Sequence, residues 1–411
     1  MTKQQRPVAP KDALMPAALV GHCPSSSSAL RALTPIVGAV FTSFLVIGLA
    51  MPVIPWHVHE ELGLPAFYVG LVAGAQFGAS FLSRFWAGNY ADTRGARRSM
   101  CLGLGLSTIS GMLYYASMFL AGRPMLSKAV LLCGRGILGA GESFIVTGAL
   151  IWGIARAGAH YTGLVMSWVG TAMYLAYALG APLGTVFFGA AGFKAIALAT
   201  IILPLSSVFF IMPLNPVAPL SKARPSFTKV IKSVWLPGVA LAFSSVGFGA
   251  ITTFVVILFA QKGWGAAWPA FSLLSIFFML GRICFGHLPD KIGGAQIALI
   301  CALIEAAGQA FIWLAWSSSL ALAGAALTGL GYSLIYPGLG VEAANSAPLE
   351  QRGVAMGAYT AFLDLALGLA GPLLGLAAGF GGVDLIYGLS TLAVLCSAVI
   401  ACQLSRRFAK K

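Results

Sequence analysis

Long apolar segments separated by short polar turns constrain this chain more than any other feature of its sequence. Each is about 20 residues long, the length that an α-helix needs to cross the hydrocarbon core of a bilayer. Strands of an outer-membrane barrel alternate in segments of only about ten residues. The sequence therefore predicts an all-α membrane protein with twelve transmembrane helices, at residues 33–56, 66–87, 99–121, 129–154, 164–190, 195–213, 235–260, 268–287, 295–316, 319–340, 354–378 and 384–404.

The composition excludes the main classes of soluble protein. Apolar types make up 59% of the 411 residues and charged types only 9%, whereas about a quarter of the residues in a soluble domain are charged. A soluble enzyme, a nucleic-acid-binding domain and a secreted disulfide scaffold are therefore excluded. The seven cysteines include no CxxC pair, so we interpret them as small core residues.

Positive charges are distributed unevenly over the predicted loops. If the N-terminus is cytoplasmic, 18 Lys and Arg residues fall in cytoplasmic segments and four in external ones. Lys and Arg concentrate on the cytoplasmic side of membrane proteins. We therefore expect both termini in the cytoplasm, with a disordered tail at 1–31 and a basic tail at 406–411.

Internal repeats divide the chain into two halves. Segments beginning at Arg84 (RFWAGNYADTRG) and Arg282 (RICFGHLPDKIG) share Arg, Gly, Asp and Gly at a constant offset of 198 residues. A basic, Pro-rich connection at 215–234 lies between the sixth and seventh predicted helices. We therefore expect two six-helix halves in parallel repeat, at 32–214 and 235–405.

With these motifs the chain resembles the major facilitator superfamily of transporters over residues 30–405. The superfamily has a signature between its second and third helices, and a second copy at the matching place in the other half. The resemblance implies two pseudosymmetric halves around a central cavity. The matching residues are Gly88, Asp92, Gly95, Arg97 and Arg98 in the first copy and Gly286, Asp290 and Gly293 in the second.

Two further motifs resemble motifs of this superfamily, and the second of them is associated with bacterial drug:proton antiporters. Arg135 and Glu142 lie in a segment similar to the arginine motif of the fourth helix. Gly180, Pro182 and Gly184 are similar to the Gly-Pro motif of the fifth helix. The resemblance implies a transporter of the antiporter-like branch.

The duplicated signature suggests a latch on the cytoplasmic side. The repeat registers place Asp92 near Arg352 and Asp290 near His160, so charge contacts there would hold the halves together. The alternative is that these are solvated turn charges that only orient the chain. Arg84 and Arg282 could likewise form a gate or reach lipid headgroups.

Few ionisable residues lie well inside the predicted helices, and each must face the bundle interior, a partner or water. Arg135 and Glu142 are seven residues apart, about 10 Å along one helix face. The fourth helix lines the central cavity in this superfamily, and burial favours the neutral form of a carboxylic acid. Glu142 is thus the first candidate for a proton-coupling acid, with Arg135 as the proton-coupling cation near it. The alternative is that Glu142 is a structural acid paired with Arg135 or with tyrosines.

Two more acids, Asp364 and Glu305, lie inside predicted helices and could be functional or structural. Asp364 occupies the position of Tyr174 in the first half, and it could either carry a proton or form a structural pair. Glu305 and Gln309 are four residues apart on a peripheral helix, so we expect hydrogen bonds between helices there.

We expect polar and aromatic residues to line the central cavity. Such a chamber suits an amphipathic organic molecule better than a sugar, although any single aromatic could instead face lipid or pack in the core. His57 and His59 are interpreted as an exposed loop pair rather than a metal site. The lining candidates are Gln76, Trp168, Tyr174, Tyr177, Phe248, Tyr332, Tyr336 and Tyr359.

These observations predict a secondary transporter in a bacterial inner membrane, not an enzyme, which exports a small amphipathic drug or metabolite in exchange for protons. The alternatives are an importer or uniporter of the same fold, and a non-transporting receptor or lipid-handling protein. No Walker loop occurs, so we expect the proton gradient rather than ATP as the energy source. We expect no cofactor, no metal and no nucleic acid; the partners are a small-molecule substrate, protons and membrane lipids, and the protein is expected to be a monomer.

Overall fold

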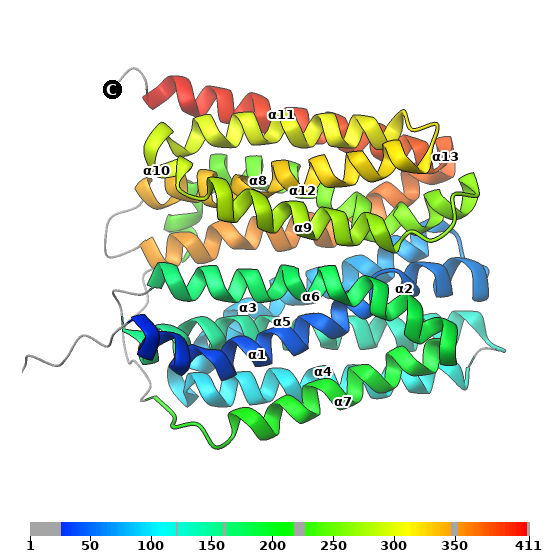
Figure 1. Ribbon diagram of the computed structural model, residues 1–411, viewed down its shortest axis with the longest axis horizontal. Coiled ribbons are helices and arrows are strands. Elements are labelled where there is room, and N and C mark those ends of the chain that lie inside the picture. Colours follow the sequence, from blue (N-terminus) through cyan, green and yellow to red (C-terminus); the bar gives the residue numbers. More distant parts are fainter. Residues whose placement is uncertain (1–25, 121, 159–161, 218–226, 347–351, 409–411) are drawn as a thin grey trace, which may run out of the picture.

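The computed structural model describes residues 26–120, 122–158, 162–217, 227–346 and 352–408. This part of the chain folds into long helices that run side by side as one bundle and contains no β-strand (Figure 1). The prediction of an all-α protein is confirmed.

The first half contains the helices up to Ile211. Gly95 and Gly192 each have a positive backbone φ angle and are the single residue between two consecutive helices. Gly158, also with a positive φ, directly follows the helix that ends at Ala157. The first helix begins at Ser26, so the predicted tail at 1–31 is helical over its last residues. The elements are α1 (Ser26–Ala50), α2 (Val53–Trp56), the π-helix η2 (His57–Glu61), α3 (Ala66–Arg94), α4 (Ala96–Met118), α5 (Pro124–Ala157), α6 (Thr162–Ala191) and α7 (Phe193–Ile211).

The second half repeats this pattern, with one short helix that the sequence did not predict. Helix α8 begins at Phe227, inside the predicted connection at 215–234. The last helix is broken at Gly381 and Gly382, between the two predicted final spans. The elements are α8 (Phe227–Lys262), α9 (Trp268–Phe285), α10 (Leu288–Ile292), α11 (Gly294–Trp313), α12 (Ser318–Asn345) and α13 (Arg352–Phe408).

Ten helical segments of the described residues are long and apolar enough to cross a membrane. Helix α4, which is rich in Ser and Gly, is not one of them, and α13 is counted once despite its break. The predicted number of twelve is consistent with these segments together with α4 and the second part of α13.

Both ends of the described chain lie at the same end of the bundle (Figure 1). We call it the termini end, and the opposite one, where α2 lies, the far end. The turns after α3 and α5 return to the termini end.

The last glycines of the two copies of the repeated motif have the same backbone conformation. Gly95 has φ 95° and ψ 147°, and Gly293 has φ 108° and ψ 137°. Glycine adopts this region readily because it has no Cβ. Each glycine ends one helix and directly precedes the next, so the repeat is structural as well as sequential.

The halves meet along two seams, α3 against α13 and α6 against α9, and α2 also contacts α8. Along the first seam the backbones approach closely: a Cβ on Gly70 would lie 2.0 Å from the carbonyl oxygen of Gly371. Glycine is required there because any side chain would separate the helices.

Candidate transport site

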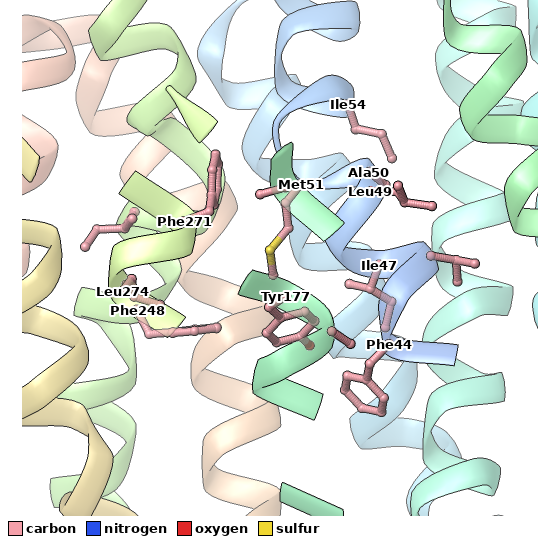
Figure 2. Close-up of a cluster of buried hydrophobic side chains, with 14 of the residues drawn as sticks. Phe44, Ile47, Leu49, Ala50, Met51, Ile54, Tyr177, Phe248, Phe271 and Leu274 are labelled. Carbon is pink, nitrogen blue, oxygen red and sulfur yellow. The ribbon is translucent and has the colours of Figure 1, made fainter. Parts of the chain in front are cut away.

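A cluster of buried apolar side chains, which we call the apolar plug, lies between the two halves (Figure 2). It combines residues of α1, α2 and α6, and Met51 between α1 and α2, with residues of α8 and α9. All of its members are buried, so the halves are sealed against each other there. The plug includes Phe44, Ile47, Met51, Ile54, Tyr177, Phe248, Phe271 and Leu274.

Glu142 lies near the middle of α5 and is hydrogen-bonded to a neutral partner. The Nε2 amide of Gln76 on α3 donates to its Oε2 over 2.7 Å. The two helices can meet because a Cβ on Gly139 would lie only 1.8 Å from the carbonyl oxygen of Gln76. Gln76 is fully buried, whereas Glu142 keeps some accessible surface. The acid therefore sits inside the bundle, and its side chain is not completely enclosed by protein.

The predicted structural pair between Glu142 and Arg135 is not found in the described residues. Arg135 is 7% exposed, and its Nε is inaccessible without a hydrogen-bond partner there. The seven-residue spacing places both groups on one face, but it also separates them by about 10 Å. Their charges still interact, because Glu142 lies within electrostatic range of Arg135.

An ion pair joins the two halves near Glu142. Arg84 on α3 approaches Oδ2 of Asp364 on α13 with its Nε at 2.6 Å and its Nη2 at 2.5 Å. The Asp364 side chain is 5% exposed and that of Arg84 25%. Arg84 therefore does not reach lipid headgroups: it binds a carboxylate across the seam, within electrostatic range of Glu142.

Four of the predicted lining aromatics form one cluster from α6, α8 and α12. Tyr174 and Tyr177 lie 5.8 Å apart between ring centroids, and Phe248 stacks on Tyr332 at 5.4 Å. The sequence analysis missed Phe278 of α9, which stacks on Tyr174 at 3.5 Å. Phe278 precedes Arg282 by one helical turn, so the two side chains lie on the same face of α9, and the guanidinium is 5.5 Å from the ring. This spacing is the sequence signal that could have identified Phe278 as a lining residue.

The remaining predicted aromatics lie elsewhere. Tyr359 is buried, and its hydroxyl donates to the carbonyl of Tyr336 over 3.0 Å. The hydroxyls of Tyr336 and Thr360 are 2.7 Å apart. These bonds join α12 to α13 within the second half. Trp168 on α6 exposes 43% of its surface.

Glu305 and Gln309 make the expected hydrogen bonds between helices. Ser244 of α8 donates to Oε2 of Glu305 over 2.5 Å. Gln309 donates to Thr328 of α12 and accepts from Ser390 of α13. Both side chains of α11 are fully buried, so they tie the second half together away from the first.

The signature residues lie at the termini end of their helices. Arg97 donates to the carbonyls of Met212 and Leu214, both at 3.0 Å, and so binds the carbonyl-rich end of α7. Arg98 is exposed, Asp92 half-buried and Gly88 within α3, while Gly286 follows the last residue of α9. The side chains of Asp290 and Arg352, and the whole of His160, lie outside the described residues, so the latch contacts stay a prediction.

The helix-5 motif packs α6 against α1. A Cβ on Gly180 would lie 2.7 Å from the Cα of Gly48, and one on Gly184 would lie 2.1 Å from the carbonyl oxygen of Leu49. Pro182 lies between them inside the helix. In the structure, the glycines of this motif allow the backbones of α6 and α1 to approach closely within the first half.

The histidine pair differs from its prediction as an exposed loop. His57 is buried, stacks on Phe193 at 4.2 Å and contacts the carboxylate of Glu61 through Nδ1. The π-helix turns its ring inward. Among the described residues, no group of three or more His, Cys, Asp or Glu could hold a metal ion.

A cavity of about 440 Å³ lies at the far end, away from the acids. The sequence analysis did not predict it. Both halves line it, mainly with aromatic and aliphatic side chains that include Trp56, Phe188, Phe259 and Trp268.

Known proteins match both the sequence and the fold. The sequence matches the Major Facilitator Superfamily over residues 36–371 and 266–408. It is 39% identical over 368 residues to "Uncharacterized MFS-type transporter YhhS" of Escherichia coli K12, covering 89% of this chain and 91% of the relative. It is 38% identical over 374 residues to "Uncharacterized MFS-type transporter STM4428" of Salmonella typhimurium, covering 90% and 96%.

Three solved structures share the fold. A bacterial homologue of the human lysosomal transporter Spinster, inward-facing and unoccupied, has a TM-score of 0.73 at 13% identity, covering 94% of this chain and 99% of that one. The D-xylose-proton symporter gives 0.72 at 14%, covering 90% and 97%. The human organic anion transporter MFSD10 gives 0.70 at 18%, covering 91% and 99%. Identities this low show the fold alone, while the sequence matches show the family: the chain is a multi-pass membrane protein of the major facilitator superfamily, a family of transporters.

Proposed function

We propose that this protein is a proton-coupled secondary transporter, which exports a small amphipathic organic compound in exchange for protons. The observation that carries the proposal is the bond between Gln76 and Glu142 inside the bundle. A carboxylate there has a neutral amide for a partner and no cation in direct contact among the described residues.

Glu142 can therefore exist in two states. Its charged form accepts a hydrogen bond from Gln76 and feels Arg84 and Arg135 at longer range. Its neutral form avoids the cost of a charge in an apolar surrounding. A permanently paired acid such as Asp364, held by two guanidinium nitrogens, has less reason to change its charge.

Exchange follows if substrate and proton compete for this acid. A compound with an amine or another hydrogen-bond donor near Glu142 would replace the proton. The rings of Tyr174, Phe248, Phe278 and Tyr332 stack on one another in the conformation described, and they would offer the compound a flat apolar surface when the halves separate. Entry of a proton from outside would then release the compound there.

The fold supports alternating access by rocking of two rigid halves. The glycine seam lets α3 and α13 lie in close backbone contact. The apolar plug packs the halves together beside a hydrogen bond that Ser272 of α9 donates to the carbonyl of Ala178 on α6. We place the protein in a bacterial inner membrane with the termini end in the cytoplasm, from the charge distribution and the bacterial relatives.

The test begins with a growth-inhibition screen of drugs, metabolites and sugars in cells that lack or overproduce the protein. A compound found in this way is then added to proteoliposomes with an imposed pH gradient and an internal pH-sensitive dye. Export by exchange requires that the compound and protons move in opposite directions. Movement in the same direction would instead show a symporter, and movement without protons a uniporter. Binding without any transport would favour a receptor.

A further inference from the structure

Arg135 is a buried cation without a partner in the described part of the chain. Its side chain is 93% buried, and the structure gives it no hydrogen bond and no ion pair there. A charged group removed from water is costly unless a counter-charge and hydrogen bonds compensate it. The nearest acid on its helix face, Glu142, is instead bonded to Gln76.

Comparison of the halves shows a second arginine at the same interface that has no ion pair within the described residues. The offset of 198 residues relates Arg84 to Arg282, and a second repeat, with an offset of 190 residues, relates Tyr174 to Asp364. Arg84 has its carboxylate, whereas Arg282 lies against the Phe278 ring and within electrostatic range of the Tyr174 hydroxyl. The pseudosymmetric copy of the ion pair therefore has a guanidinium and a phenol but no acid.

Two tyrosines link these arginines. Tyr177 is within electrostatic range of Arg135, Tyr174 is within range of Arg282, and the two rings are 5.8 Å apart. Arg84 is paired with Asp364, whereas Arg135 and Arg282 have no ion pair within the described residues. The acids within electrostatic range of the two tyrosines are Glu142, for Tyr177, and Glu305, for Tyr174. Both of these acids are hydrogen-bonded to neutral partners, Gln76 and Ser244, so neither compensates the buried Arg135 by direct contact.

From this arrangement we infer that Arg135 binds an anionic group, a carboxylate or a phosphate, of the transported compound. Guanidinium suits such groups because its nitrogens form two parallel bonds to them. The inference rests on the proposed function for the same chamber and narrows the substrate class. The compound carries its anionic group at Arg135 and its proton-competing group about 10 Å along the same helix face, at Glu142.

Equilibrium binding to the purified full-length protein in detergent tests this at neutral pH without a proton gradient. The probes are 4-phenylbutyrate and phenyl phosphate, with 4-phenylbutanol and 4-phenylbutylamine as matched neutral and cationic compounds, and thermal stabilisation is the readout. We expect at least one anionic probe to bind about tenfold more tightly than 4-phenylbutanol, because hydrogen bonds between charged groups are stronger than those between neutral ones.

Variants assign that preference to one side chain. Arg135→Gln should remove it, Arg135→Lys should retain part of it, and Arg123→Gln at the exposed start of α5 should leave it unchanged. Each variant is compared after size-exclusion chromatography has shown a monodisperse protein. If Arg135→Gln does not fold, the inference is decided by the wild-type protein alone, from whether 4-phenylbutyrate binds more tightly than 4-phenylbutanol.

The inference is overturned if anionic and neutral probes bind equally, if neither anion binds, or if the preference survives in Arg135→Gln. Failure of proton coupling would give a different result: Glu142→Gln would leave transport and its pH profile unchanged, while the binding preference at Arg135 would persist.

Discussion

Arg84 on α3 and Asp364 on α13 form an ion pair across the seam between the two halves, with Nε 2.6 Å from Oδ2. The acid is almost completely buried. A pair in this position holds the halves together in the conformation described and must loosen or move with them when they rock.

Removing either partner should destabilise the protein, because the other charge is left without compensation. We expect Arg84→Gln and Asp364→Asn each to cost about 2 kcal/mol, and the double variant to cost clearly less than the two effects added together. Thermal unfolding followed by tryptophan fluorescence measures all three. The exposed pair of Lys262 and Asp384 is the control, since Asp384→Asn should cost no more than about 0.5 kcal/mol. If the losses of unfolding free energy in Arg84→Gln and Asp364→Asn simply add up in the double variant, the two side chains do not stabilise each other and the ion pair is contradicted.

The glycine that brings α5 against α3 should be intolerant of a methyl group. In Gly139→Ala the new Cβ would overlap the carbonyl of Gln76, so the helices must separate; we expect a loss of about 2 kcal/mol or more and reduced transport. Gly136→Ala, three residues away, meets only the Cβ of Ala79 at 3.8 Å, and should be neutral or slightly stabilising. Equal stability of the two variants, measured by thermal unfolding, would contradict the close packing.

Glu305 should prove structural. Glu305→Gln keeps the shape and can still accept the hydrogen bond from Ser244, so transport and its pH profile should match the wild type. Glu305→Ala leaves a cavity and an unpaired hydroxyl, which should cost about 2–4 kcal/mol in the thermal unfolding of the protein. A shifted pH profile in Glu305→Gln would place a titrating group in the second half and would weaken the case for Glu142.

Helix positions could be predicted from the sequence, because apolar length and glycine turns are local properties. The break of α13 at Gly381 and Gly382 falls between the predicted final spans. The predicted helix ends at the termini end differ from the observed ones by several residues. For example, the predicted span 66–87 ends before α3 does, at Arg94, because polar residues can extend a helix beyond the membrane. The short α10 was missed, since five residues give no periodic signal.

The acids could be found from the sequence, but their partners could not. Glu142 stood out because a charge inside an apolar segment is costly. Its bond to Gln76 depends on how closely Gly139 lets two helices approach, and the pairing of Arg84 with Asp364 joins residues from different halves. Such contacts depend on packing in three dimensions, which periodicity does not specify.

Orientation can be tested by labelling single cysteines in a variant without the native ones. Thr93→Cys lies at the exposed termini end of α3, and Gly122→Cys lies at the exposed far end before α5. From the charge distribution we expect a membrane-impermeant maleimide to label only position 122 in intact cells, and position 93 only after the cells are opened. The reverse pattern would place the termini outside.

The most direct test of the account is accumulation of the transported compound by Glu142→Gln. Glutamine keeps the size of the side chain and can still bond to Gln76, but it cannot exchange a proton. In inverted vesicles with an imposed pH gradient, the wild type should concentrate the compound. The Gln variant should bind it and allow exchange without a gradient, yet fail to concentrate it at any pH. Concentration by Glu142→Gln with an unchanged pH profile would contradict the account and would leave Asp364 as the remaining candidate.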